Sequence, residues 1–218
     1  MQFMTGDTLR RIAVFGISRA GKDYIIDGAI NRLTQQGEEY RHISMIGTVQ
    51  ALLNGRKLKE MDYQNKLKLM DEAHSKMDSE SASTNIIVDE HYCFPKYYGG
   101  KIIHSGYVDE KLPFKEVYDD ELEMVYEVVF NESELKKYDS AFFLDIDPSI
   151  ILERFRTSEG GKANYDITLT DVRNWILFEK YNLKRLCAEA QIPFHRLINP
   201  ETSSNDLALG ILSITHYV

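Results

Sequence analysis

Short apolar runs and longer amphipathic segments alternate along this chain. Five of the runs have the length of β-strands and lie at 11–15, 41–46, 85–89, 140–146 and 193–198. In the segments between them, apolar residues recur three to four positions apart, which is the spacing of one helix face. Strands that alternate with helices are typical of a parallel sheet covered by helices. The pattern therefore predicts an α/β fold.

The helices are predicted between and after these strands. The first begins at Lys22 and ends near Gly37, because glycine commonly ends a helix. The uneven apolar pattern of 49–77 predicts two helices, interrupted near Asn54-Gly55. Three further helices are predicted, one starting at 147–149, one at 170–189 and one at 206–215.

The segment 97–137 has the weakest pattern. It contains a possible strand at 125–130, and acidic residues are frequent between Glu116 and Glu134. We interpret this acidic run as a solvated face, since runs of like charge usually face water.

Size and composition favour a single domain made of residues 1–218. The net charge of −8 makes duplex nucleic acid an unfavourable partner, although backbone amides and a few arginines can still bind a small anion. No apolar run approaches the roughly 18 residues of a membrane span, and the first residues lack the apolar core of a secretory signal. The two cysteines form no C-x-x-C pattern. We therefore expect a cytoplasmic protein without a disulfide framework or zinc site.

The strongest motif follows the first predicted strand. Residues 16–23 read Gly-Ile-Ser-Arg-Ala-Gly-Lys-Asp, with the Gly-x4-Gly-Lys spacing of a phosphate-binding loop. Two glycines at this spacing let backbone N–H groups turn toward a phosphate, and the following helix N-terminus adds positive potential. Lys22 would reach the β- and γ-phosphate oxygens. The residues expected to bind the nucleotide are Gly16, Ser18, Arg19, Ala20, Gly21, Lys22, Asp23 and Tyr24.

Position 23 departs from the usual motif, which has Ser or Thr there to hold Mg²⁺. Asp23 could bind the ion directly or through water, since hard cations prefer oxygen ligands. Its negative charge would also lie close to the triphosphate. A helix cap explains the residue equally well, so both interpretations stay open.

A second acidic position ends the third predicted strand. Asp89 follows the apolar run 85–88, and the carboxyl ends of parallel strands line a common crevice. We therefore expect Asp89 to lie near the bound phosphates, where it would hold Mg²⁺ or act as base for an acceptor hydroxyl. His91 is interpreted as a structural or surface residue.

Basic residues flank a glycine-containing segment near 157–164. A mobile basic lid, at about 155–168, would cover the transferring phosphate and exclude water. Its cations would be Arg154, Arg156, Lys162 and Arg173. A helical region at about 48–80 would bind the acceptor through Arg56, Lys57, Lys66 and Lys68. Ordinary exposed cations are the alternative explanation for both groups.

Together these motifs resemble the P-loop nucleoside monophosphate kinase group over nearly the whole chain. The layout is most similar to archaeal-type adenylate kinase: 88–91 resembles its Asp-Thr-His motif, and 146–154 resembles the segment leading into its lid. The segment 61–67 is loosely similar to its acceptor-side helix. The Arg-x-Gly-Lys-Asp variant at 19–23 is instead similar to phage-type deoxynucleoside monophosphate kinases and animal phosphomevalonate kinases. Their activity shows that Asp at this position is compatible with catalysis. Two departures from adenylate kinase are Glu90 in place of Thr and a lid with few arginines.

The resemblance implies a three-layer P-loop kinase fold with a five-stranded parallel sheet of order 2-3-1-4-5, a helical acceptor region and a lid. It implies phosphoryl transfer that depends on ATP and Mg²⁺, with a nucleoside monophosphate or nucleoside as the favoured acceptor. Asp23 and Asp89 would hold the metal, and the catalytic residues would be Lys22, Asp89, Arg154, Arg156 and Arg173.

Two alternatives follow from the departures. The lid suggests a kinase of a non-nucleotide metabolite. Asp23 together with the lid suggests an ATP-binding regulatory protein that transfers nothing and acts through a protein partner.

Overall fold

The computed structural model describes residues 9–56, 61–95, 97–98, 101–102, 116–119, 124–130, 132–157 and 166–215. Within these ranges the strands are β1 (Arg11–Phe15), β2 (Tyr40–Ser44), β3 (Asn85–Glu90), β4 (Cys93–Pro95), β5 (Tyr97–Tyr98), β6 (Lys101–Ile102), β7 (Glu116–Asp119), β8 (Met124–Val128), β9 (Ser140–Leu144) and β10 (Phe194–Leu197). The helices are α1 (Lys22–Gln35), α2 (Met45–Leu53), α3 (Tyr63–Ser81), α4 (Glu132–Leu135), α5 (Pro148–Thr157), α6 (Leu169–Ala190) and α7 (Ser203–Thr215).

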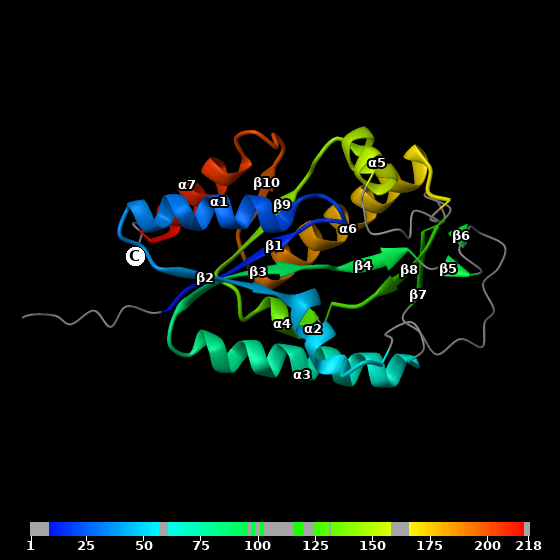
Figure 1. Ribbon diagram of the computed structural model, residues 1–218, viewed down its shortest axis with the longest axis horizontal. Coiled ribbons are helices and arrows are strands. Elements are labelled where there is room, and N and C mark those ends of the chain that lie inside the picture. Colours follow the sequence, from blue (N-terminus) through cyan, green and yellow to red (C-terminus); the bar gives the residue numbers. More distant parts are fainter. Residues whose placement is uncertain are drawn as a thin grey trace, which may run out of the picture.

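A five-stranded parallel sheet forms the centre of the molecule, with the order β2-β3-β1-β9-β10 (Figure 1). When these five strands alone are numbered along the chain, the order is 2-3-1-4-5, so the expected fold is confirmed. The register pairs Asp89 with Val14 on one side and with Ser44 on the other. The carboxyl ends of β1, β2 and β3 therefore meet at one edge of the sheet.

Helices cover both faces of this sheet. α1 packs against α7 on one side, and α3 lies on the other side (Figure 1). α6 contacts α4, α5, β4 and β10. Because helices cover both faces, all residues of β1 and β9 are buried, as expected for the central strands of a parallel sheet.

The predicted elements are present with shifted boundaries. The second strand ends at Ser44, two residues earlier than expected, because the Ser44 hydroxyl accepts a hydrogen bond from the Gly47 N–H and caps α2. Asn54 adopts a left-handed conformation with φ of 49° and ends α2. α3 begins after Asp62, whose carboxylate caps it. The predicted interruption between two helices is therefore confirmed.

The region 97–137 differs most from the expectation. Antiparallel strands form a β4-β8-β7 sheet and a β5-β6 pair, of which only β8 was anticipated. These strands have two to five residues, too few to show a clear period. We expected the acidic run between Glu116 and Glu134 to face water. This is wrong for Glu134, whose side chain is buried near Arg11 and Lys137.

None of the helices in the described part of the chain is both long and apolar enough to cross a membrane.

Candidate functional site

The loop between β1 and α1 has the backbone shape of a phosphate-binding loop. Gly16 and Gly21 have φ of 155° and 96°, and Gly21 lies in the region that favours glycine. Arg19, between them, also has a left-handed φ of 68°. A non-glycine residue in this conformation costs free energy and is often found at a binding site. Three of the six residues 16–21 therefore have a positive φ, which closes a tight turn.

The amino terminus of α1 has no side-chain cap. Gly21 occupies the capping position and has no side chain to accept a hydrogen bond, whereas α2, α3 and α6 are capped by the side chains of Ser44, Asp62 and Thr168. The first N–H groups of a helix have no partner within the helix. At α1 they and the helix dipole are therefore available to an anion.

Lys22 connects the two ends of this loop. Its Nζ donates a hydrogen bond to the Gly16 carbonyl at 2.6 Å and lies 3.0 Å from His91 Nε2. Burial lowers the pKa of Lys22, while the nearby carboxylates of Glu179 and Asp89 oppose this shift. The amine is therefore buried, with carboxylates nearby that favour its charged form.

Arg154 on α5 holds the loop from the other side. Its Nη1 donates to the Ala20 carbonyl at 2.6 Å and to the Arg19 carbonyl at 3.1 Å. A Cβ atom at position 21 would lie 3.1 Å from the same Nη1. Glycine at this position therefore serves both the backbone conformation and the approach of the guanidinium.

Asp89 lies at the carboxyl end of β3, facing the loop. Its carboxylate accepts hydrogen bonds from the Met45 N–H at 2.7 Å and the Ser44 hydroxyl at 3.2 Å. Burial raises the pKa of Asp89 to about 6, against the effect of Lys22 and the Met45 N–H. The nearby Asp23 raises it further. Two carboxylates thus share one corner of the site.

Glu90 lies on the opposite face of β3, because successive side chains of a strand alternate between faces. It is fully buried and accepts a hydrogen bond from the Tyr138 hydroxyl at 2.6 Å. His74 Nε2 lies 3.4 Å from the same oxygen. The acidic residue that replaces Thr in the resemblance is therefore part of the core beneath the sheet.

His91 is buried beside Lys22. Burial lowers its pKa well below the ordinary value, and the Lys22 cation adds to this effect. The imidazole is therefore neutral at pH 7 and accepts from the lysine through Nε2. Its Nδ1 is buried without a hydrogen-bond partner, and its ring lies 4.8 Å from that of Phe94.

Glu179 on α6 lies beneath the loop and is fully buried. The Tyr92 N–H donates to its Oε1 at 3.3 Å. Burial raises the pKa of Glu179 to about 7, against the effect of Lys22 and the N–H groups of Tyr92 and Gly16. The protonation of Glu179 is therefore linked to two residues of the loop, Gly16 and Lys22.

This coupling predicts a pH-dependent stability. The pKa of Glu179 in the folded protein lies above the ordinary value of 4.5. Its contribution to the free energy of unfolding is therefore fully present below about pH 4.5 and is lost as the pH rises through 7. The loss is at most on the order of 3 kcal/mol. In Glu179→Gln this part of the pH dependence is expected to disappear, as measured by urea unfolding at pH 5 and pH 8. Glu189→Gln, on the exposed side of α6, is the control. Equal pH dependence in the wild type and Glu179→Gln would contradict the assignment.

A cleft of about 760 Å³ lies over these groups. The nucleotide-binding residues expected from the sequence line it, apart from Gly16, together with Asp89 and Arg154.

The other described basic residues expected at the site lie outside the cleft. Arg156 and Arg173 are exposed and do not line it. Arg56 and Lys68 are also exposed and do not line it, and Lys66 forms an ion pair with Glu127 at 2.7 Å. Lys57, Lys162 and most of the expected lid, 158–165, lie outside the described residues.

Three residues of the site were not anticipated. They are Ser44, which donates to Asp89, Glu179, which accepts from the Tyr92 N–H, and His42, which lies 3.8 Å from Asp23. A signal for Glu179 exists in the sequence, since it is a carboxylate on the apolar face of the helix 170–189. His42 and Ser44 stand near the end of a strand that borders β3, a position that points to the crevice only once the strand order is known.

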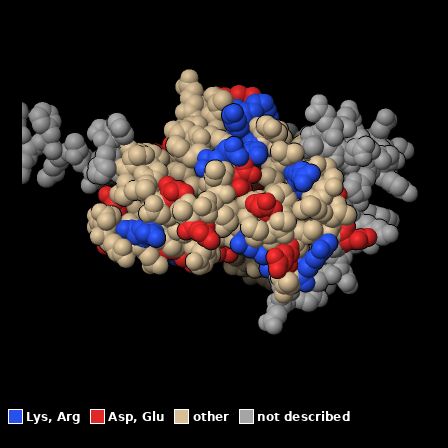
Figure 2. All heavy atoms as spheres, turned by 90° about the horizontal axis from the view of Figure 1, so that it is seen from above, with Lys and Arg blue, Asp and Glu red and all other residues tan. Residues whose placement is uncertain are grey.

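Charges of both signs are mixed over the described surface drawn in Figure 2, where Lys and Arg side chains lie among Asp and Glu side chains. Among the described residues that line the cleft, the basic ones are Arg19, Lys22 and Arg154, and the acidic ones are Asp23 and Asp89. The cleft therefore brings cations and carboxylates together at the loop.

Comparison with solved structures finds two similar kinases at low sequence identity. Shikimate kinase from Bacteroides thetaiotaomicron is similar with a TM-score of 0.52 at 14% sequence identity, over 94% of this chain and 99% of that chain. A sugar kinase from Janibacter sp. HTCC2649 has a TM-score of 0.48 at 13% identity, over 95% and 96% of the two chains. A scan against protein-family models and a search of the curated proteins found no match. The likeness to shikimate kinase shows a P-loop kinase-like fold.

Proposed function

We propose that this protein transfers the γ-phosphoryl group of ATP to a small acceptor in a reaction that depends on Mg²⁺. The observation that carries the proposal is the meeting of Lys22, Arg154, Asp23 and Asp89 around one cleft at the uncapped start of α1. This combination of a buried cation, a second cation and two carboxylates is what phosphoryl transfer requires.

The loop would bind the triphosphate. Its backbone N–H groups and the first turn of α1 would hold the phosphates, and Lys22 would exchange its bond to the Gly16 carbonyl for the β- and γ-phosphate oxygens. Arg154 already contacts the loop backbone, so its guanidinium would reach the transferring group with little movement. Arg156 and Arg173 would have to approach with the lid, at about 155–168. Catalysis would come from positioning and charge neutralisation.

The two carboxylates fit a hard divalent cation. Asp89 is fixed by the Met45 N–H and the Ser44 hydroxyl, and Asp23 lies beside it at the start of α1. Oxygen ligands of this kind are those that Mg²⁺ prefers. An ion held by these carboxylates would supply positive charge beside the phosphates. The protein itself holds the carboxylates in place and keeps water from the buried part of the site.

The favoured acceptor from the resemblance is a nucleoside monophosphate or nucleoside, bound beside the helical region 48–80. One observation favours a second candidate, a metabolite that carries a hydroxyl group and no phosphate. Beyond the loop and the first turn of α1, Arg154 is the one lysine or arginine among the described residues that line the cleft. The other lining residues there include Ser44, Ile46, Asp89, His91 and Phe94. Lys66, which was expected to hold an acceptor phosphate, is neutralised by Glu127.

An acceptor panel tests the proposal and separates the two candidates. ADP release from ATP and Mg²⁺ is measured with nucleoside monophosphates, nucleosides, and hydroxyl-bearing acids and sugars. Release that requires one acceptor supports a kinase and names its substrate class. Tight ATP binding without release for any acceptor would overturn it and favour an ATP-binding regulatory protein.

A further inference from the structure

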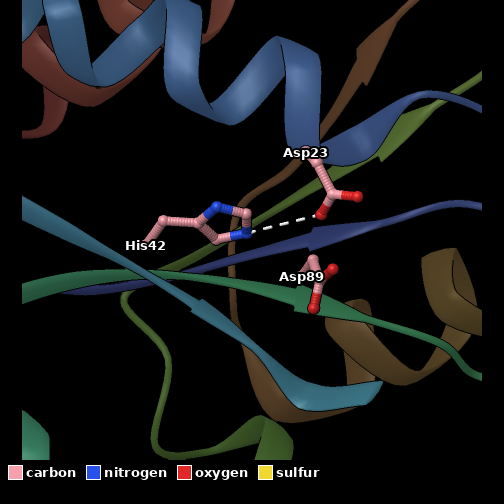
Figure 3. A group of neighbouring side chains, drawn as sticks. All are labelled: Asp23, His42 and Asp89. Atoms are coloured by element: carbon pink, nitrogen blue, oxygen red, sulfur yellow. Dashed lines mark ion pairs between the residues drawn. The ribbon is translucent and has the colours of Figure 1, made fainter. Parts of the chain in front are cut away.

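Three possible metal ligands from separate elements converge beside the phosphate-binding loop. Asp23 stands at the start of α1, His42 on β2 and Asp89 on β3, and one ligand atom of each lies within 4.8 Å of the others. Figure 3 shows the His42 ring pointing toward the Asp23 carboxylate, with Asp89 close by. Chain segments that are distant in sequence thus bring one nitrogen and two carboxylate ligands to one point.

His42 is oriented as a metal-binding histidine is. Its Nδ1 lies 3.1 Å from the Asp27 carboxylate, so Nδ1 donates and Nε2 keeps its lone pair in the neutral imidazole. Nε2 is buried without a hydrogen-bond partner and faces Asp23 Oδ1 at 3.8 Å. A carboxylate that fixes one ring nitrogen while the other binds the ion is the usual support of a ligating histidine.

We propose that Asp23, His42 and Asp89 bind a divalent ion of the first transition series, such as Mn²⁺, in preference to Mg²⁺. The physical reason is the nitrogen ligand. The two carboxylates suit Mn²⁺ as they suit Mg²⁺, whereas the imidazole adds a nitrogen ligand that favours first-row transition ions, whose affinity rises from Mn²⁺ along the series. Mg²⁺ prefers oxygen ligands and gives up its water reluctantly.

The site accounts for an acidic residue in a phosphate-binding loop. Asp23 and Asp89 place two negative charges where the triphosphate must approach, and each would repel it. An ion with two positive charges held by both carboxylates cancels this charge. The role given to the ion rests on the proposed function, because the ion would accompany the nucleotide phosphates. The ion site itself consists of protein groups alone.

The distances allow closure without a change of fold. Ligand atoms of one ion lie about 2 Å from it and thus within about 4 Å of each other. The separations of up to 4.8 Å are slightly longer. The Asp23 side chain is 75% exposed and its Oδ1 already lies 3.8 Å from His42 Nε2, so small side-chain rotations would bring the three ligands together.

Mn²⁺ binding to the metal-stripped full-length protein tests the proposal. Free Mn²⁺ is measured by electron paramagnetic resonance without nucleotide, and pulsed spectra of the bound ion report coupling to ¹⁴N. One bound Mn²⁺ with ¹⁴N coupling is expected, and Mg²⁺ at an equal concentration should not displace it. In His42→Gln the ¹⁴N coupling is expected to vanish and the affinity to fall about 10–100-fold, and Asp27→Asn should weaken binding by a similar factor.

The control is His195→Gln on the opposite edge strand of the sheet, which should leave both readouts unchanged. Absence of ¹⁴N coupling in the wild type would overturn the proposal even if His42→Gln failed to fold. Unchanged affinity in a folded His42→Gln would also overturn it. Either result is compatible with acceptor-dependent ADP release, whereas failure of the acceptor panel leaves the Mn²⁺ measurement unaffected, so the two proposals fail separately.

Discussion

Lys22→Ala is expected to lower acceptor-dependent ADP release by at least about 10²–10³-fold, which is the usual cost of removing one group that stabilises developing charge. The reason lies in the position of the amine, which is buried at the base of the loop and close to the cleft. No other lysine lines the cleft within the described residues. The loss should be seen in kcat/KM for ATP, measured under steady-state conditions with a saturating acceptor.

The fold should survive this substitution. Burial opposes the charged form of Lys22, so removing the side chain also removes a cost, although the Gly16 carbonyl loses its donor. Circular dichroism and thermal unfolding check this point. Lys184→Ala, at an exposed position on α6, is the matched control and should keep full activity. Unchanged turnover in a folded Lys22→Ala would refute the proposed kinase function.

Asp89→Asn is expected to lower turnover by about 10²–10⁴-fold, since both roles considered for Asp89 need a carboxylate. The change should be well tolerated by the fold, because the amide oxygen can still accept from the Met45 N–H. The matched control is Asp71→Asn on the exposed side of α3. Activity near the wild-type level in a folded Asp89→Asn would show that the carboxylate has neither role.

The dependence of turnover on Mg²⁺ concentration separates these two roles. If Asp89 holds the ion, half-saturation in Asp89→Asn should require more Mg²⁺, and added metal should restore part of the activity. If Asp89 removes the proton from the acceptor hydroxyl, half-saturation should stay constant while kcat falls. The buried position of Asp89 beside Asp23 leads us to expect the first result.

Local patterns were sufficient to predict the positions of the five parallel strands and of the loop after β1. β1 is apolar after Arg11, and the Gly-x4-Gly-Lys spacing stands directly after it, so strand, turn and helix start are all specified by neighbouring residues. The break at Asn54-Gly55 was equally local. The strand order came from the resemblance and was confirmed by the pairing.

Other features depended on contacts between distant segments. Nothing near Glu90 in the sequence indicates that Tyr138 would bond it inside the core, and the short antiparallel strands after β3 are defined only by their partners. Arg154 is separated by more than 130 residues from the loop carbonyls that it contacts. The neutralisation of Lys66 by Glu127 likewise removes a cation that the helix pattern alone would assign to a ligand.

The sequence by itself thus determined the α/β class and the tight Gly-x4-Gly-Lys turn between β1 and α1, because each rests on periodicity or on a motif of a few adjacent residues. Only the tertiary structure decided which polar groups meet in the cleft. His42, Asp23 and Asp89 lie on three elements, and Glu179 reaches the loop from a fourth. Their proximity follows from strand order and helix packing, which are properties of the whole chain and are not encoded in any one segment.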